Sequence, residues 1–292
     1  MGKYPSIYIH TLMNIGGPAL MQRVALITKH EKARWIAPYL APLGYEVFGT
    51  SLFDTDILGT FSGEVERTLS PMDAALAKAK KACELTDADW GLGSEGSFGG
   101  GPAPGMINWN DELLCLYQAS TGIKIYAHAA GATSVQELSL DGKVPLQQKL
   151  LRFPDQLWML RSEKGLGKNI EKQIEKGLSA DQLLLALQQI ETSSQNIKIE
   201  PDLRAMNCPQ RQQMIAKAAE DLVRRLSETC PQCEAFDFVI KEKQSGLPCS
   251  LCSLPTEQAK SWIRICDSCS HRNNEVVPHK GADPTYCQYC NP

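Results

Sequence analysis

The sequence predicts an α/β protein: a layered domain with a mixed sheet, followed by a small domain with two zinc ribbons or knuckles. Two observations support this prediction. Strand-like and helix-like segments alternate through the first 228 residues, which is typical of α/β layer architectures. After residue 229, eight of the eleven cysteines form four Cys-x-x-Cys pairs, a spacing in which each pair supplies two ligands to a zinc ion.

The totals fit one full hydrophobic core with a small appendix. The chain has 292 residues, of which 43% are hydrophobic and 22% charged. No apolar run reaches the ~20 residues that a membrane helix needs. The net charge of -3 gives no general attraction to nucleic acid or anionic membranes. Because paired thiols without a secretory signal indicate metal binding rather than disulfides, we expect a cytoplasmic protein.

Residues 1–20 have neither helical nor strand periodicity. They contain His10, Asn14 and Pro18 where a secretory signal needs an apolar core. Met21 directly precedes a clean strand pattern, so we interpret residues 1–20 as an unstructured leader, with Met21 as an alternative start to Met1. We predict an α/β domain over residues 21–228 and a zinc-binding domain over residues 229–292.

The elements of the first domain follow from periodicity and turn residues. Ser70 followed by Pro71 is the clearest helix start, because serine caps a helix and proline suits its first position. Two of the strands are close enough to form a hairpin, which adds antiparallel pairs to the sheet. Residues 53–67 are polar and rich in glycine, so we expect a loop there. The predicted strands are 24–28, 45–49, 89–94, 113–117, 123–126, 156–160 and 197–202, and the predicted helices are 30–43, 70–85, 168–177, 179–190 and 209–227.

The segment Gly91–Pro102 combines six glycines with Ser94, Glu95 and Ser97. Its Gly-x-Gly-x-x-Gly spacing matches a dinucleotide fingerprint, but that fingerprint must open a helix. The later glycines and prolines exclude a helix here. We therefore predict a ligand-binding loop that leaves the strand at 89–94, with the carboxylate of Glu95 as a metal ligand or a base.

Three polar clusters adjoin predicted strands. Thr28 and Lys32 follow the first strand, where lysine and backbone N–H groups can hold phosphate, although a solvated helix start has the same composition. Four carboxylates between residues 54 and 66, including Glu66, suit Mg²⁺ or are ordinary surface acids. Arg204 is a candidate oxyanion clamp, or it pairs with Asp202.

The cysteine tail, residues 229–292, is predicted to bind two structural zinc ions through four cysteines each. Sequential and interleaved pairings of the motifs both close two sites, and we favour the sequential one. The tail has six Lys/Arg against seven Asp/Glu, and zinc-bound thiolates add negative charge, which disfavours nucleic acid. Cys83, Cys115 and Cys208 are interpreted as core residues or surface thiols. The predicted ligands are Cys230, Cys233, Cys249, Cys252, Cys266, Cys269, Cys287 and Cys290.

Five further motifs accompany the four Cys-x-x-Cys pairs: Ala25–Lys32 (ALITKHEK), Phe53–Asp56 (FDTD), Gly59–Arg67 (GTFSGEVER), Ser94–Gly99 (SEGSFG) and Asp202–Ala205 (DLRA). With these motifs, over roughly residues 21–292, the sequence resembles a bacterial family that is catalogued only as a domain of unknown function. The resemblance implies no activity. Gly100 and Met206 depart from the family pattern, in which we expect Pro-His-Pro and histidine; if either histidine binds metal there, this chain binds metal differently.

A second similarity is to the inosine-triphosphate pyrophosphatase superfamily. Thr28 and Lys32 partly match its first loop, lacking the asparagine and one residue of spacing. Ala75–Ala79 matches its Ala-x-x-Lys-Ala helix, and Ser94-Glu95-Gly96 falls where its acidic glycine loop belongs. The similarity implies a phosphate held by Thr28, Lys32 and Lys78, with Glu95 binding Mg²⁺ or activating water.

Taken together, we predict a Mg²⁺- or Mn²⁺-dependent hydrolase of a nucleotide or another phosphorylated metabolite, with two structural zinc ions. The alternative is a non-catalytic ligand-binding or adaptor protein whose zinc tail docks a protein partner. Neither nucleic acid nor a membrane is an expected partner. The candidate catalytic residues are Glu95 and Glu66, and the candidate ligand-binding residues are Thr28, Lys32, Lys78, Ser94, Ser97 and Arg204.

Overall fold

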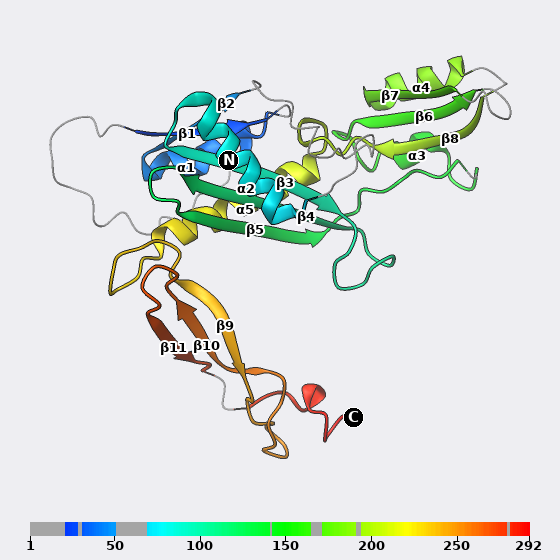
Figure 1. Ribbon diagram of the computed structural model, residues 1–292. Helices are drawn as coiled ribbons and strands as arrows, with labels where there is room; N and C mark the ends of the chain where they lie inside the picture. Colours follow the sequence, from blue (N-terminus) through cyan, green and yellow to red (C-terminus); the bar gives the residue numbers. More distant parts are fainter. Residues whose placement is uncertain are drawn as a thin grey trace.

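The computed structural model describes residues 21–28, 31–50, 69–140, 142–164, 171–190, 194–278 and 281–292. Within these residues the chain forms three β-sheets (Figure 1). No helix among them is long and apolar enough to cross a membrane. The predicted leader, the predicted loop at 53–67 and Glu66 lie outside the described residues.

The largest sheet has five strands in the order β2-β1-β3-β4-β5. Its first three strands are parallel to one another, whereas β4 and β5 run antiparallel, so the prediction of a mixed sheet is confirmed. The predicted hairpin is confirmed as β4 and β5, which are longer than expected. The strands are β1 (Gln22–Ile27), β2 (Tyr45–Thr50), β3 (Trp90–Phe98), β4 (Trp109–Gln118) and β5 (Lys124–Ala132).

Helices cover both faces of this sheet (Figure 1). α2 (Pro71–Thr86) packs on one face, against residues such as Ala25 and Ile27 of β1. On the opposite face, α1 (Ala33–Leu40) and α5 (Pro209–Ser227) bury the larger apolar core. A short 3-10 turn, Ala41–Leu43, extends α1. The alternation of side chains along each strand thus supplies both core layers.

The start of α2 follows the predicted signals. The side chain of Ser70 accepts a hydrogen bond from the backbone N–H of Asp73 at 3.1 Å, and Pro71 occupies the first helical position. The helix lies very close to β3. A Cβ atom on Gly91 would lie 2.0 Å from the carbonyl oxygen of Ala79, and one on Gly93 would lie 1.8 Å from that of Ala75. These two glycines therefore permit close contact between helix and sheet.

The strand predicted at 89–94 is confirmed as the first part of β3, but the prediction that a ligand loop leaves it after Ser94 was wrong for residues 95–98, because β3 continues through Phe98. Pairing with β4 extends over the whole of β3, so Ser94, Glu95 and Ser97 are strand residues. The turn begins at Gly99, and three consecutive glycines there have positive φ angles of 101°, 72° and 69°. Glycine is favoured at such angles because it has no Cβ.

A second, three-stranded sheet lies between β5 and α5 in the sequence, with the order β7-β6-β8 and antiparallel pairing throughout. Its core includes Trp158, Leu160 and Leu183. The predicted helix at 168–177 was wrong: residues 171–178 form a strand, because pairing with β6 overrides the helix propensity of its Glu, Lys and Gln residues. The elements are α3 (Leu146–Leu150), β6 (Trp158–Lys164), β7 (Glu171–Leu178), α4 (Ala180–Gln189), β8 (Ser194–Pro201) and the 3-10 turn Ala205–Asn207.

The cysteine tail contains the third sheet, which is antiparallel and has the order β11-β10-β9. Its strands are β9 (Val239–Ser245), β10 (Ala259–Ile265) and β11 (Arg272–Val276), and a 3-10 turn follows at Pro284–Tyr286. The Cys-x-x-Cys pairs lie in the turns around this sheet. The prediction of a small zinc ribbon or knuckle region after an α/β layer is therefore confirmed as a fold.

Candidate functional site

Two groups of four cysteines gather at opposite ends of the tail sheet. Within each group the sulfur atoms all lie within 4.8 Å of one another. Such a set suits a tetrahedral metal ion, and zinc in particular. The first four-cysteine site is Cys230, Cys233, Cys266 and Cys269, and the second four-cysteine site is Cys249, Cys252, Cys287 and Cys290.

The pairing is interleaved, so the sequential order that we favoured was wrong. The physical reason is the antiparallel pairing of β9 with β10, in which Val239 lies opposite Ile265 and Ser245 lies opposite Ala259. The pair before β9 and the pair after β10 therefore meet at one end of the sheet. The pair between the two strands is left at the other end, where the last pair joins it.

Backbone N–H groups prepare one thiol in the second site for metal binding. The N–H groups of Cys252 and Leu251 lower the pKa of Cys249 to about 7. Cys266 in the first site also has its pKa lowered to about 7: burial opposes the shift, but the N–H groups of Cys269 and Ser268 outweigh it. Because metals bind thiolates rather than thiols, each site thus contains one sulfur that deprotonates easily.

A buried group of charged side chains lies beside β3, on the face covered by α1 and α5. Arg211 donates through Nε to Oε1 of Glu112 at 2.5 Å, and neither side chain is exposed. Nζ of Lys32 donates to Oγ of Ser94 at 2.9 Å and lies 4.0 Å from Oε2 of Glu112. A Cβ on Gly96 would lie 2.5 Å from both Arg211 and Glu112, so glycine is needed there to make room for the ion pair.

A second pair lies on the other face of β3, because successive strand residues point in opposite directions. There, Lys78 of α2 forms an ion pair with Glu95, and both residues are buried. The structure thus brings together Lys32 with Ser94 and Lys78 with Glu95. We name these two pairs, with Glu112 and Arg211, the β3 charge cluster.

The β3 charge cluster lies where the strand order of the sheet reverses. β1 is followed in sequence by its neighbour β2, and the chain then returns to β3 on the other side of β1. β1 ends at Ile27, whereas β3 continues past it, so Lys32 reaches Ser94 beyond the end of β1. Thr28 also lies at this end, with its N–H bonded to the carbonyl of Thr50. In open α/β sheets, ligands bind at such reversal points.

Burial sets the electrostatics of the β3 charge cluster. Burial, and next the nearby Arg211, lower the pKa of Lys32 from 10.5 to about 7, although Glu112 and Glu95 act in the opposite direction. The cluster holds three basic groups and two carboxylates, and all five are at least nine-tenths buried. Counted over the described residues, with every group ionised, the cluster therefore carries one positive charge in excess.

The remaining predicted residues lie elsewhere. Ser97 is half-buried in β3, and its carbonyl accepts a hydrogen bond from the amide of Asn110. Arg204 binds the buried carboxylate of Asp202 with two nitrogen atoms, as in the alternative interpretation. Burial of Asp202 opposes ionisation, but hydrogen bonds from Arg204 and Asn207 lower its pKa. Cys83, Cys115 and Cys208 are buried, in agreement with core positions.

Sequence reasoning missed Glu112, which is central to the cluster. The signal was present: with a strand period of two, Glu112 shares a face with Leu114 and Leu116, both of which are fully buried. An acidic residue on the same face as these buried leucines predicts a basic partner that is buried as well. Arg211 offered a similar signal, since it shares a buried face of α5 with Met214 and Ile215.

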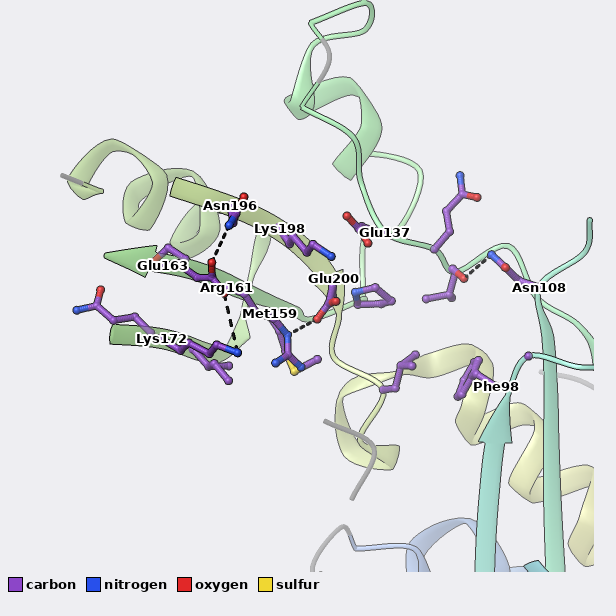
Figure 2. A pocket seen from close by; sticks show the side chains of 18 residues that line it. Phe98, Asn108, Glu137, Met159, Arg161, Glu163, Lys172, Asn196, Lys198 and Glu200 are labelled. Carbon is purple, nitrogen blue, oxygen red and sulfur yellow. Dashed lines mark hydrogen bonds and ion pairs between the residues drawn. The ribbon is translucent and has the colours of Figure 1, made fainter. Parts of the chain in front are cut away.

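Two cavities flank the five-stranded sheet. One, of about 1100 Å³, lies between this sheet and the β7-β6-β8 sheet (Figure 2). Several of its polar groups contact one another: Arg161 contacts Glu200, and Glu163 contacts Asn196 at 2.6 Å and Lys172 at 4.0 Å. The other, of about 970 Å³, is lined by the start of α2, strands β3 to β5 and residues of the cysteine tail next to the first four-cysteine site, and we name it the knuckle cavity.

Comparisons with known proteins place the chain in one family. The model of the family described as Domain of unknown function (DUF6671) matches residues 78–292. This confirms the resemblance to a domain of unknown function, although the motifs at 25–32, 53–56 and 59–67 precede the matched region. The similarity to the inosine-triphosphate pyrophosphatase superfamily stays a prediction. Comparison with curated proteins gave no match.

Among solved structures, lipoprotein GNA1162 from Neisseria meningitidis is 12% identical in sequence to this chain, with a TM-score of 0.20. The match covers 42% of this chain and 85% of the lipoprotein. A similarity at this level supports no inference about fold or function, so the function has to be inferred from the residues themselves.

Proposed function

The chain belongs to the DUF6671 family, whose description assigns no activity, and from its own geometry we propose that it binds a phosphorylated metabolite at the β3 charge cluster and hydrolyses it. The observation that carries this proposal is the excess positive charge of the cluster. Lys32, Lys78 and Arg211 are buried with Glu95 and Glu112. An anion bound beside Lys32 neutralises the excess.

The energetics favour an anionic ligand over an empty site. Burying a charge is costly, and Glu112, the carboxylate near Lys32, is already paired with Arg211, so Lys32 either loses its proton or takes a further negatively charged neighbour. Phosphate supplies that charge together with several hydrogen-bond acceptors. The position agrees as well, because the cluster lies at the carboxyl ends of β1 and β3, where α/β sheets bind ligands.

The pair between Lys78 and Glu95 suggests how binding leads to hydrolysis. A phosphate that engages Lys78 replaces Glu95 as its partner and releases the carboxylate. The released Glu95 accepts a proton from water while the water oxygen bonds to phosphorus. The ester P–O bond breaks, and the leaving oxygen keeps the electron pair of that bond and takes up the proton from Glu95 to leave as an alcohol. Among the described residues, the groups of three or more side chains suited to a metal are the two cysteine sites. A Mg²⁺ or Mn²⁺ ion at Glu95 therefore needs substrate phosphate as a further ligand, and it would supply charge neutralisation.

The test is a panel of nucleoside phosphates and sugar phosphates, assayed for release of phosphate or pyrophosphate with Mg²⁺ or Mn²⁺. We expect Glu95→Gln to lose turnover yet retain binding, since its amide keeps the shape but takes no proton. Lys32→Met should weaken binding about tenfold or more. Lys81→Met is the matched control, because Lys81 lies on the exposed side of α2 and pairs there with Glu84. Full turnover in Glu95→Gln would refute the hydrolase.

The adaptor alternative is favoured by one observation, the apolar surface of the second four-cysteine site. Leu251 is 73% exposed, and Tyr286 and Tyr289 are also largely exposed, all three close in sequence to its cysteines. Exposed apolar groups of this kind mark protein-docking surfaces. If ligand binding stabilises the protein without turnover, and Leu251→Ser with Tyr289→Ser abolishes capture of a protein partner, the adaptor function replaces the hydrolase.

A further inference from the structure

The knuckle cavity is built from two parts of the chain that are far apart in sequence. One side consists of the first residues of α2 and the faces of β3, β4 and β5. The other side consists of Phe236–Lys241, together with Asp267 and Ser268, which lie between the metal ligands Cys266 and Cys269. With a volume of about 970 Å³ it is large enough for a drug-sized molecule.

Apolar side chains from both parts line this cavity and remain exposed. Met72 comes from α2, and Phe236 and Ile240 come from the cysteine tail. Their exposed fractions are 50%, 38% and 43%. Because apolar surface gains free energy when it leaves water, three such groups around one cavity favour an apolar or aromatic occupant.

The polar groups of the cavity show which kind of ring it accepts. Asp111 lies 2.9 Å from Nε2 of His128, which is half exposed, and Ser97 lies directly opposite Asp111 in the sheet. These groups offer hydrogen-bond acceptors beside the apolar wall. Glu95 is paired with Lys78, and the other three carboxylates of the lining are matched by three Lys and Arg side chains, so the cavity has no excess positive charge to attract phosphate. The carboxylates are Glu95, Asp111, Asp237 and Asp267, and the basic residues are Lys124, Arg225 and Lys241.

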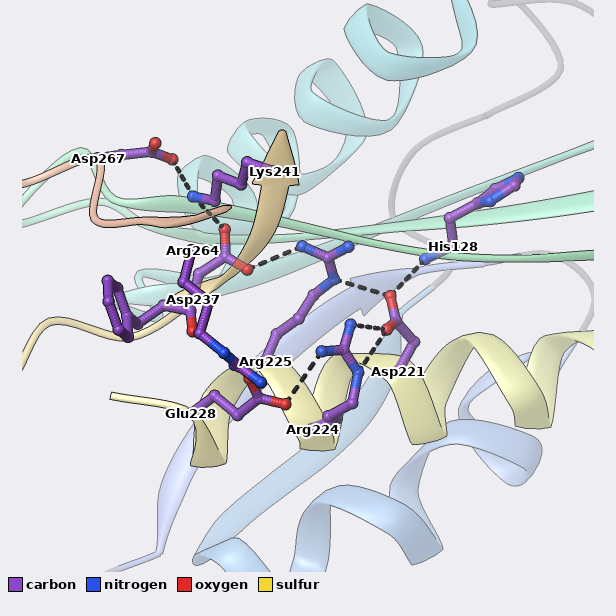
Figure 3. Close-up of polar contacts among 10 residues, drawn as sticks. His128, Asp221, Arg224, Arg225, Glu228, Asp237, Lys241, Arg264 and Asp267 are labelled. Atoms are coloured by element: carbon purple, nitrogen blue, oxygen red, sulfur yellow. Dashed lines mark hydrogen bonds and ion pairs between the residues drawn. The ribbon is translucent and has the colours of Figure 1, made fainter. Parts of the chain in front are cut away.

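A chain of ion pairs fixes the tail wall to α5 (Figure 3). Arg225 of α5 contacts Asp237 at 2.8 Å, and Lys241 contacts Asp237 at 3.0 Å and Asp267 at 2.6 Å. Arg225 also contacts Asp221, whose carboxylate accepts the backbone N–H of His128 at 3.0 Å. The network thus runs from β5 to a residue between two metal ligands, and the wall depends on the first four-cysteine site.

We propose that the knuckle cavity binds an uncharged or cationic nitrogen heterocycle of the nucleobase kind, and that metal in the first four-cysteine site holds its wall in place. The ring is sandwiched by the apolar side chains from the two parts, and its N–H groups donate to Asp111 and Ser97. This inference does not rest on hydrolysis or on anion binding at the β3 charge cluster.

The experiment titrates the zinc-loaded full chain with adenosine, guanosine, cytidine and uridine by calorimetry. At least one of these nucleosides, which carry no phosphate, should bind. Phe236→Ser and Asp111→Asn should each weaken binding about tenfold. Tyr289→Ser is the matched control, because Tyr289 is an exposed aromatic residue beside the second site. Absence of binding by all four nucleosides at millimolar concentration overturns the proposal, and so does binding that neither variant weakens.

The metal dependence has its own matched pair of variants. Cys269 and Cys290 are each the last, exposed ligand of their site. Cys269→Ser should weaken nucleoside binding, whereas Cys290→Ser should leave it unchanged. Lys241→Met breaks the ion-pair network without touching a metal ligand and should act like Cys269→Ser. Equal effects of the two cysteine variants refute the role of the first site. Lys32→Met should leave nucleoside binding intact, so failure of anion binding and failure of this inference are distinguishable.

Discussion

Glu112 and Arg211 form an ion pair without solvent contact, and Gly96 leaves the space that the pair occupies. For single residues, the sequence identified most of the basic members of the β3 charge cluster but not Glu112, the acid that contacts Arg211 and lies near Lys32. Lys32 and Lys78 were singled out for phosphate, and the structure places them beside β3. Glu112 was overlooked because its burial depends on α5, which is distant in sequence and packs Arg211 against it.

Loss of one partner of this pair should destabilise the protein strongly. Glu112→Gln removes the carboxylate that the buried Arg211 guanidinium contacts, so the free energy of unfolding in urea should fall by about 3–5 kcal/mol at pH 7. Glu84→Gln removes the acid of the exposed pair with Lys81 and should cost at most about 1 kcal/mol. Comparable losses in the two variants would contradict the assignment of a buried pair.

Lys32 should make stability depend on pH. Its folded pKa of about 7 lies below the ordinary 10.5, so between these values the unfolded chain binds more protons than the folded one. Through this residue, the free energy of unfolding therefore rises as the pH increases from about 7 to 10.5. Below pH 7, Lys32 adds none of this stabilisation, because it is protonated in both states. Urea unfolding at several pH values should show a steeper rise in the wild type than in Lys32→Met. Parallel curves would place the Lys32 pKa at its ordinary value.

At the scale of elements, β3 shows where sequence patterns succeed and fail. Its beginning at residue 90 was predicted, but its second half was interpreted as a loop because glycine disfavours strands. Tertiary packing explains the glycines: Gly91 and Gly93 face α2, and Gly96 faces the ion pair on the other side. Likewise, residues 171–178 have helix-forming side chains, and pairing with β6 makes them a strand.

The close contact between α2 and β3 is testable with one methyl group. Gly93→Ala places a Cβ 1.8 Å from the carbonyl oxygen of Ala75, which is backbone and cannot rotate away. We expect a loss of about 3 kcal/mol in the free energy of unfolding, measured by thermal or urea unfolding. Gly49→Ala in β2 is the control, because its Cβ would make only ordinary contacts, the nearest at 3.6 Å. A stable Gly93→Ala protein would show that helix and strand lie further apart.

At the scale of the whole molecule, alternation predicted the α/β layers, and the Cys-x-x-Cys spacing predicted the metal-binding tail. Spacing alone left the pairing of the motifs open, because gaps of similar length close either arrangement. The antiparallel register of β9 and β10 decides it, and that register depends on contacts between residues about 20 positions apart.

Metal content can verify the interleaved pairing. The wild type should contain two zinc ions per chain. Cys230→Ser combined with Cys266→Ser disrupts only the first site and should leave one zinc ion. Cys230→Ser combined with Cys249→Ser disrupts both sites and should leave none. Elemental analysis of the purified proteins measures the zinc content. Sequential pairing would instead leave no zinc ion in the first combination and one zinc ion in the second.

The interleaved arrangement also sets the order in which a growing chain can complete its tail. At the ribosome, the first site lacks half of its sulfur ligands until Cys266 and Cys269 have emerged, although Cys230 and Cys233 appear much earlier. The second site waits for Cys290, which follows the other seven cysteines of the two sites in sequence. Neither site can therefore bind a metal ion through all four cysteines at the stage when α5 has left the ribosome and the tail has not. The knuckle cavity, whose wall includes Asp267 and Ser268 beside the first site, consequently forms only after these residues have been made.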